Sequence, residues 1–154
     1  MRKGDTAPDF ELPDETGTKH ALSGYLTGGP VVLFFYPAAM TPGCTKESCH
    51  FRDLGPEFTA LGAQRVGISA DPVEKQGRFS EKYGFDYPLL SDEDRSVADA
   101  FGVKRGWGPL PNRRMTFVID TDRTVLESIS SDLRMDVHAD RALEVLRARA
   151  EAPS

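Results

Sequence analysis

Two cysteines five residues apart, Cys44 and Cys49, are the residues of this chain best suited to redox chemistry. The nucleophilic form of cysteine is the thiolate, and only a few per cent of a free thiol is ionised at neutral pH. On one α-helix, residues five apart differ by about 140° in direction and lie about 8.6 Å apart at Cα. A disulfide needs Cα atoms closer than ~7 Å. The pair therefore bridges only if at least one helical turn unwinds, which suits a transient catalytic disulfide better than a structural one.

The residues before Cys44 indicate how that sulfur is positioned. Residues 31–36, VVLFFY, are apolar, β-branched or aromatic, which is typical of a strand buried on both faces. Pro37 ends the strand, and Pro42 fits the first turn of a helix. We therefore expect a strand, a tight loop and a helix that carries Cys44 in its first turn. The N–H groups and the dipole of that turn favour a negative sulfur. Thr41 either caps this helix or directs its hydroxyl at Cys44.

The rest of the chain predicts an α/β fold, with a mixed central β-sheet flanked by helices, in a single domain over residues 1–154. A short hairpin is expected from 6–12 and 19–22, and Gly55-Pro56 should break the helix that follows Pro42. Asp71 is the predicted N-cap of a helix that ends near Tyr83, and Ser91-Asp92 is predicted to cap another. The remaining expected elements are strands at 65–69, 87–90, 115–120 and 124–130, a short helix at 96–101, a loop at 104–112 and a helix at 138–150.

Composition excludes several classes of partner. The net charge of −5 at pH 7 argues against a nucleic-acid or anionic-membrane surface. The chain shows neither a signal-peptide pattern nor an apolar stretch long enough to span a bilayer, so we expect a cytoplasmic protein. In a reducing cytosol, two nearby cysteines are more often catalytic, redox-sensing or metal-binding than structural.

Two alternatives use the same residues. Cys44, Cys49 and His50 could ligate a metal, but their spacing scatters them around a helix, and His20 and His138 are distant in sequence. A thiol redox sensor or relay without sustained turnover is the stronger rival.

The segment YPAAMTPGCTKESC resembles the peroxiredoxin active-site pattern Pro-x-x-x-Thr-x-x-Cys, here Pro37, Thr41 and Cys44. The second cysteine five residues later is similar to the bacterioferritin-comigratory-protein, or Q-type, subgroup. The resemblance covers nearly the whole chain, through GDTAPDFELPDETG, FDYPLLSD, VADAFGV and TFVID. It implies a thioredoxin-like fold and a thiol-dependent peroxidase that uses no metal, haem or flavin cofactor.

The resemblance also implies a role for each cysteine. Cys44 attacks the peroxide and becomes a sulfenic acid, and Cys49 then forms a disulfide with it. A thioredoxin-like partner reduces that disulfide. Thr41 contacts the peroxide, and Pro37 shields the site from water.

The family's remote arginine falls on Arg114, which stabilises the thiolate, and Glu47 matches the acidic residue that orients this arginine. Arg113 is adjacent, and successive strand residues face opposite ways, so only one of the two arginines points at Cys44. Without the resemblance, the residues favour two solvated arginines.

Two regions depart from the subgroup. Ala38, Ala39 and Met40 stand where the subgroup often has polar residues, which favours alkyl or lipid hydroperoxides as substrates. The Gly/Pro-rich loop around Trp107 lies outside the strong motifs, and Trp107 is either a partner anchor or a half-buried loop residue. The subgroup resemblance suggests a monomer or a weak homodimer.

Overall fold

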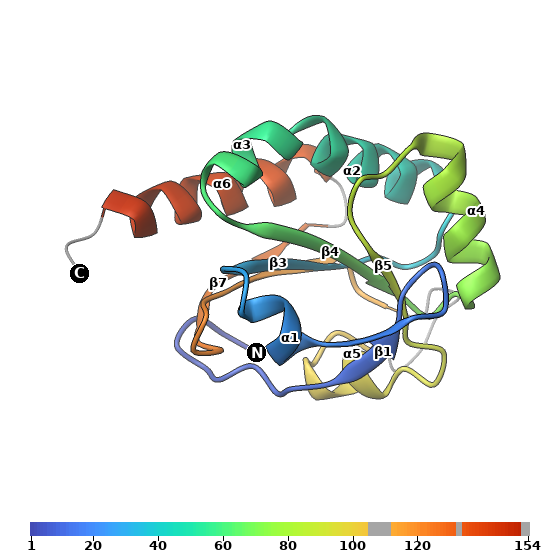
Figure 1. Ribbon diagram of the computed structural model, residues 1–154, viewed down its shortest axis with the longest axis horizontal. Helices are drawn as coiled ribbons and strands as arrows, with labels where there is room; N and C mark the ends of the chain where they lie inside the picture. The colour runs from blue at the N-terminus through green and yellow to red at the C-terminus, as the bar shows by residue number, and fades with distance from the viewer. Residues whose placement is uncertain (105–111, 132–133, 152–154) are drawn as a thin grey trace.

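The strand predicted before Cys44 is the middle strand of the main sheet. The computed structural model describes residues 1–104, 112–131 and 134–151, and its five-stranded sheet has the order β5-β4-β3-β6-β7 (Figure 1). The central strand β3 (Val31–Phe35) pairs in parallel with β4 (Gln64–Ser69), which pairs in parallel with β5 (Leu89–Ser91). On its other edge β3 pairs antiparallel with β6 (Met115–Ile119), which forms a hairpin with β7 (Val125–Ser130). The predicted mixed sheet and the final hairpin are confirmed.

Helices cover both faces of this sheet (Figure 1). One face carries α2 (Pro42–Asp53), α3 (Gly55–Ala60) and α6 (Met135–Glu151), with α4 (Val73–Tyr83) towards one side. The opposite face carries α1 (Leu22–Leu26) and α5 (Ser96–Ala100), beside the small antiparallel sheet of β1 (Glu11–Pro13) and β2 (Lys19–Ala21).

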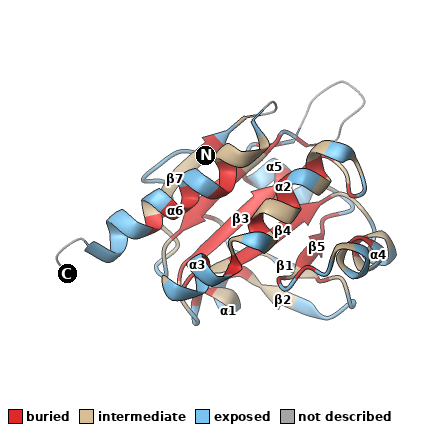
Figure 2. Ribbon diagram, turned by 90° about the horizontal axis from the view of Figure 1, so that it is seen from above, coloured by how far each residue is buried: buried red, intermediate tan, exposed pale blue. Residues whose placement is uncertain are grey.

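The side chains of β3 alternate between two cores. Phe34 belongs to the core beneath α2 and α6, where its ring stacks on Phe51 at 4.2 Å between centroids. Phe35 belongs to the core beneath α1 and α5. Every residue of β3 is fully buried, as the red central strands of Figure 2 show. The apolar run therefore forms a strand whose two faces are both covered.

One predicted helix boundary is confirmed and another is shifted. The break at Gly55 is confirmed, because α2 ends at Asp53 and α3 begins at Gly55. The final helix begins at Met135, three residues before the predicted start.

Both capping predictions need correction. The N-cap position of α4 is Pro72 and has no side-chain cap, so the prediction for Asp71 is wrong. The carboxylate of Asp92 does accept the N–H groups of Val97 and Ala98 at the start of α5, at 3.2 and 2.9 Å. The N-cap position itself is Arg95, and Ser91 lies in β5.

The predicted loop around Trp107 lies outside the described residues, which resume at Asn112. Lys104 and Asn112 pair as an isolated antiparallel bridge at the base of this segment. Within the described part of the chain, no helix is both long and apolar enough to cross a bilayer.

Candidate active site

Sheet pairing brings Arg114 to Cys44. The carboxyl end of β3 lies beside the amino end of the antiparallel strand β6, with Phe35 paired to Met115. The loop after β3 leads into α2 and Cys44, and Arg114 immediately precedes β6. Arg114 Nη2 donates to Cys44 Sγ at 3.3 Å. Two residues far apart in sequence therefore meet because their strands are neighbours of opposite direction.

Glu47 holds the same guanidinium from the other end. Glu47 lies three residues after Cys44, on the same face of α2. Its Oε1 accepts from Arg114 Nη1 at 3.0 Å, and its side chain is fully buried. Burial of the Arg114 guanidinium lowers its pKa, but the negative charges of Glu47 and Cys44 outweigh this effect and raise it. Arg114 therefore stays cationic beside a buried sulfur, whereas Arg113 is exposed.

Gly43 lies directly under this guanidinium and leaves little room for a side chain. A Cβ at position 43 would lie 3.2 Å from Arg114 Nη2 and 3.4 Å from the Cε of Met135 at the start of α6. The guanidinium thus crosses directly over the first turn of α2. A larger residue at this position would displace Arg114 or Met135.

Thr41 is fixed by the loop that it ends. It occupies the N-cap position of α2 without a side-chain cap, so the capping alternative is wrong. Its hydroxyl donates its hydrogen to the carbonyl of Ala38 at 2.7 Å and not to Cys44, and its own carbonyl accepts the N–H of Thr45 at 2.9 Å. Because this hydroxyl donates to a carbonyl, its oxygen is still able to accept a hydrogen bond from a substrate O–H.

Asp71 is a site-supporting residue that the sequence interpretation missed. Its Oδ2 accepts the N–H of Ala39 at 2.6 Å and the hydroxyl of Ser69 at 2.7 Å, and its Oδ1 pairs with Lys75 at 3.1 Å. The carboxylate therefore clamps the loop that contains Pro37, which is buried, and Met40, which is exposed with a φ of 68°. A signal was available: Asp71 follows β4, and the carboxyl ends of parallel strands meet at one edge of a sheet.

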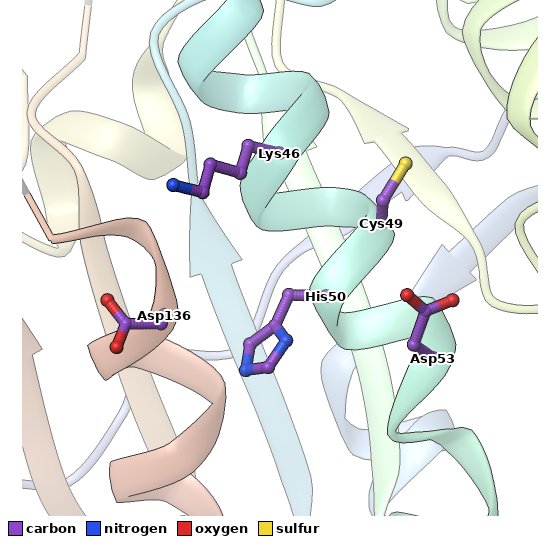
Figure 3. Close-up of a pocket in the computed structure, with 5 residues that line it drawn as sticks. All are labelled: Lys46, Cys49, His50, Asp53 and Asp136. Carbon is purple, nitrogen blue, oxygen red and sulfur yellow. The ribbon is translucent and has the colours of Figure 1, made fainter.

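Cys49 has a different environment from Cys44. Both thiols are free, but Cys44 is fully buried and Cys49 is half-buried. Burial raises the pKa of the Cys49 thiol. Cys49 lines a surface pocket of about 280 Å³ together with Lys46, His50, Asp53 and Asp136 (Figure 3). The two cysteines share an unbroken helix, so a disulfide requires α2 to unwind.

The metal alternative gains no support from this arrangement. Figure 3 shows Cys49 and His50 pointing away from each other on α2, and His50 Nε2 instead pairs with Asp140 of α6 at 2.8 Å. Across residues 1–104, 112–131 and 134–151, no group of three or more His, Cys, Asp or Glu side chains is placed to hold a metal ion.

Comparison with known proteins agrees with this geometry. Residues 3–128 match the model of the AhpC/TSA family. The chain is 41% identical over 148 residues to a chloroplastic peroxiredoxin Q of Sedum lineare, covering 96% of this chain and 78% of that protein.

Two solved structures share the fold. The crystal structure of peroxidoxin BcpB from Mycobacterium tuberculosis superposes with a TM-score of 0.93 at 66% identity, over 96% of this chain and 97% of that one. The bacterioferritin comigratory protein of Xanthomonas campestris superposes with a TM-score of 0.84 at 35% identity, over 92% of both chains. The thioredoxin-like fold is confirmed. The chain belongs to the AhpC/TSA family, and it is a peroxiredoxin related to the Q-type and bacterioferritin comigratory proteins.

Proposed function

We propose that this peroxiredoxin reduces hydrogen peroxide and organic hydroperoxides through the Cys44 thiolate. The observation that carries the proposal is the buried Arg114 guanidinium 3.3 Å from the Cys44 sulfur, held by Glu47 at 3.0 Å. A fixed cation favours the thiolate, and the same cation stabilises charge that develops on a departing oxygen.

In the first step the thiolate attacks the nearer peroxide oxygen. An S–O bond forms as the O–O bond breaks, so Cys44 is oxidised to the sulfenic acid and the peroxide is reduced to water or an alcohol after protonation. Arg114 and the N–H groups of Gly43 and Cys44 are the donors to the substrate oxygens. Thr41 accepts the substrate O–H, and the buried Pro37 limits water.

In the second step the Cys49 thiol attacks the Cys44 sulfur. The sulfenic oxygen leaves as water and the Cys44–Cys49 disulfide forms after α2 unwinds locally. A thioredoxin-like dithiol then restores both thiols by disulfide exchange. In the folded helix Cys49 borders a surface pocket, whereas Cys44 is fully buried, which favours Cys49 as the sulfur attacked by that partner.

Substrate preference, assembly and location complete the proposal. The loop beside the site presents Ala38 and the exposed apolar side chain of Met40, which supports organic hydroperoxides as substrates. The related protein of Xanthomonas campestris is described as having alkyl peroxide reduction activity. We propose that residues 1–154 act as one domain, as a monomer or weak homodimer, in the cytoplasm, where two free thiols would stay reduced.

The test is sustained turnover. The protein is mixed with many equivalents of hydrogen peroxide, or of cumene hydroperoxide, together with thioredoxin, thioredoxin reductase and NADPH. We expect continuous NADPH consumption that Cys44→Ser abolishes. Consumption that stops after about one equivalent would favour the redox-sensor alternative, and turnover by Cys44→Ser would exclude Cys44 as the attacking residue.

Mass spectrometry tests the intermediate directly. After one equivalent of peroxide, the peptides that contain Cys44 and Cys49 should lose two hydrogens and resist alkylation. An oxygen retained on Cys44, with Cys49 still alkylated, would exclude the proposed disulfide.

A further inference from the structure

A fully buried histidine lies behind the active-site ion pair. His138, at the end of the first turn of α6, has no exposed surface. It is not one of the two residues that form the Cys44–Arg114 contact. Its Nε2 bonds to the carbonyl of Ser131 at 2.8 Å, and its Nδ1 bonds to the Thr116 hydroxyl at 2.8 Å. A carbonyl only accepts, so Nε2 carries a hydrogen. The Nε2–H group is therefore the side of the ring that carries partial positive charge.

That edge faces the carboxylate that holds Arg114. His138 Nε2 lies 3.6 Å from Oε2 of Glu47, a distance longer than a hydrogen bond but short enough for electrostatic attraction. The two oxygens of Glu47 are thus divided: Oε1 accepts from Arg114, and Oε2 faces His138. The contacts therefore connect His138 of α6 to Glu47 of α2 and Glu47 to Arg114. Arg114 in turn contacts the Cys44 sulfur.

The charges explain why such a residue is needed. The thiolate and Glu47 place two anions around one guanidinium, in a region where both side chains are fully buried. A buried carboxylate is costly unless several groups stabilise its charge. If the support of His138 is lost, Glu47 holds Arg114 less firmly, and the guanidinium is less well placed on the sulfur.

We infer that His138 is a positioning residue for the peroxide step, which acts through Glu47 to hold Arg114 against Cys44. The inference rests on the proposed function of Cys44 and Arg114. It assigns a role in the reaction to the N-terminal part of α6, a segment that supplies no group to the substrate.

Two substitutions separate the contacts of the imidazole. Glutamine places an amide nitrogen near the position of Nε2 and keeps the contacts to Ser131 and Glu47. Asparagine reaches only the Nδ1 position and keeps the contact to Thr116. Both substitutions remove the ring from the core, and asparagine also leaves a void one methylene larger, so the thermal midpoint of each variant is compared before its rate is interpreted.

We measure the second-order rate constant of Cys44 oxidation by peroxide in rapid mixing, across a pH series, together with the thermal midpoint of each variant. We expect His138→Asn to lose roughly tenfold in this rate constant. His138→Gln should stay within about threefold of the wild type. In a Glu47→Gln background, the two His138 variants should no longer differ, because the residue through which His138 acts is altered.

The outcomes are distinct. Equal rates for the two single variants, or a difference that persists with Glu47→Gln, would overturn the role of His138. A wild type that does not reduce peroxide would instead overturn the proposed function. If His138→Asn fails to fold, the coupling is tested by NMR of the imidazole nitrogens of His138, which is left unsubstituted. We expect these resonances to differ between wild type and Cys44→Ser, and unchanged resonances would exclude coupling between the two residues.

Discussion

A single guanidinium determines the surroundings of the Cys44 sulfur. Arg114 contacts both Cys44 and Glu47, and it is 6% exposed, whereas its neighbour Arg113 is exposed. The two arginines lie just before β6, on successive residues that face opposite ways, and only Arg114 is buried. The local residues alone favoured two solvated arginines, and only the resemblance to peroxiredoxins selected Arg114.

Arg114→Ala should slow the oxidation of Cys44 by peroxide by roughly 10²–10³-fold, because a donor aimed at the developing charge is lost. Arg113→Ala is the matched control and should leave the rate within about twofold, as expected of an exposed side chain. Rapid-mixing oxidation of each variant measures both effects. A larger loss in Arg113→Ala would show that the wrong arginine has been assigned.

Cys49→Ser separates the two chemical steps. The first oxidation of Cys44 should proceed at a rate within about threefold of the wild type, because the Arg114 and Glu47 contacts do not involve Cys49. Thioredoxin-linked turnover should stop, since no intramolecular disulfide forms. Single-turnover oxidation and NADPH-coupled cycling are measured on the same preparation. Wild-type cycling by Cys49→Ser would remove Cys49 from the resolving role.

The helix α2 is anchored on both sides of Cys49, although the proposed disulfide requires it to unwind between the two cysteines. The carbonyl of Ser48 accepts the Tyr87 hydroxyl at 2.6 Å, and the carbonyl of Phe51 accepts from Arg65 Nη1 at 2.9 Å. His50 pairs with Asp140 on α6. These contacts stabilise the helical form, so they oppose disulfide formation while they preserve the geometry for the peroxide step.

The His50–Asp140 contact is the most accessible of these anchors. Its side chains are 32% and 54% exposed, so the pair contributes about 0–1 kcal/mol. Asp140→Asn should therefore speed disulfide formation after oxidation by up to about fivefold, and it should leave Cys44 oxidation unchanged. Quenched-flow alkylation followed by mass spectrometry measures both rates.

Glu144→Gln is the control for this prediction. Glu144 also lies on α6, but it pairs with Arg141 of the same helix at 2.8 Å. Its substitution should leave the rate of disulfide formation as it is in the wild type. Equal effects from Asp140→Asn and Glu144→Gln would mean that net charge, and not the contact to α2, controls the rate.

The molecule as a whole places its chemistry at one edge of the sheet. The carboxyl ends of β3 and β4 and the amino end of β6 meet there, and α2 and α6 close over them. Cys44, Glu47, Arg114 and His138 come from three separate parts of the chain. Only the complete sheet brings these groups within contact of one another.

Because the site depends on tertiary structure, only the features that carry local sequence signals could be predicted. The run 31–36 and the pair Pro42 and Cys44 carry local signals, so the central strand and the helix after it were predictable. Asp71 was assigned to a helix cap because Asp-Pro is a local signal for one, whereas the partner that ties it to the site loop, Ala39, is on a different segment. The pairing of His138 with Glu47 has no local signal at all, since it depends on how α6 packs on α2.

The turn of the β1–β2 hairpin allows a prediction about folding stability that does not involve the active site. Asp14, at its turn, accepts hydrogen bonds from Thr16 N–H at 2.8 Å and Thr18 N–H at 3.1 Å, and pairs with His20 Nε2 at 2.9 Å. Burial raises the pKa of Asp14, but the hydrogen bonds from Thr16, His20 and Thr18 outweigh burial and lower the pKa below its ordinary value of 3.8.

Because the folded-state pKa of Asp14 lies below the unfolded value of 3.8, its stabilising effect is complete above that value and is lost as pH falls through the folded pKa. Asp14→Asn should lower the free energy of unfolding by roughly 1–2 kcal/mol at neutral pH, because a charged acceptor of several hydrogen bonds is replaced. The difference from the wild type should shrink as pH falls below 3.8 and through the lower folded-state pKa of Asp14. Urea unfolding across a pH series measures this, with Asp99→Asn as a control for the removal of one exposed negative charge. A difference that stays constant down to acid pH would show that the charge of Asp14 does not stabilise the turn.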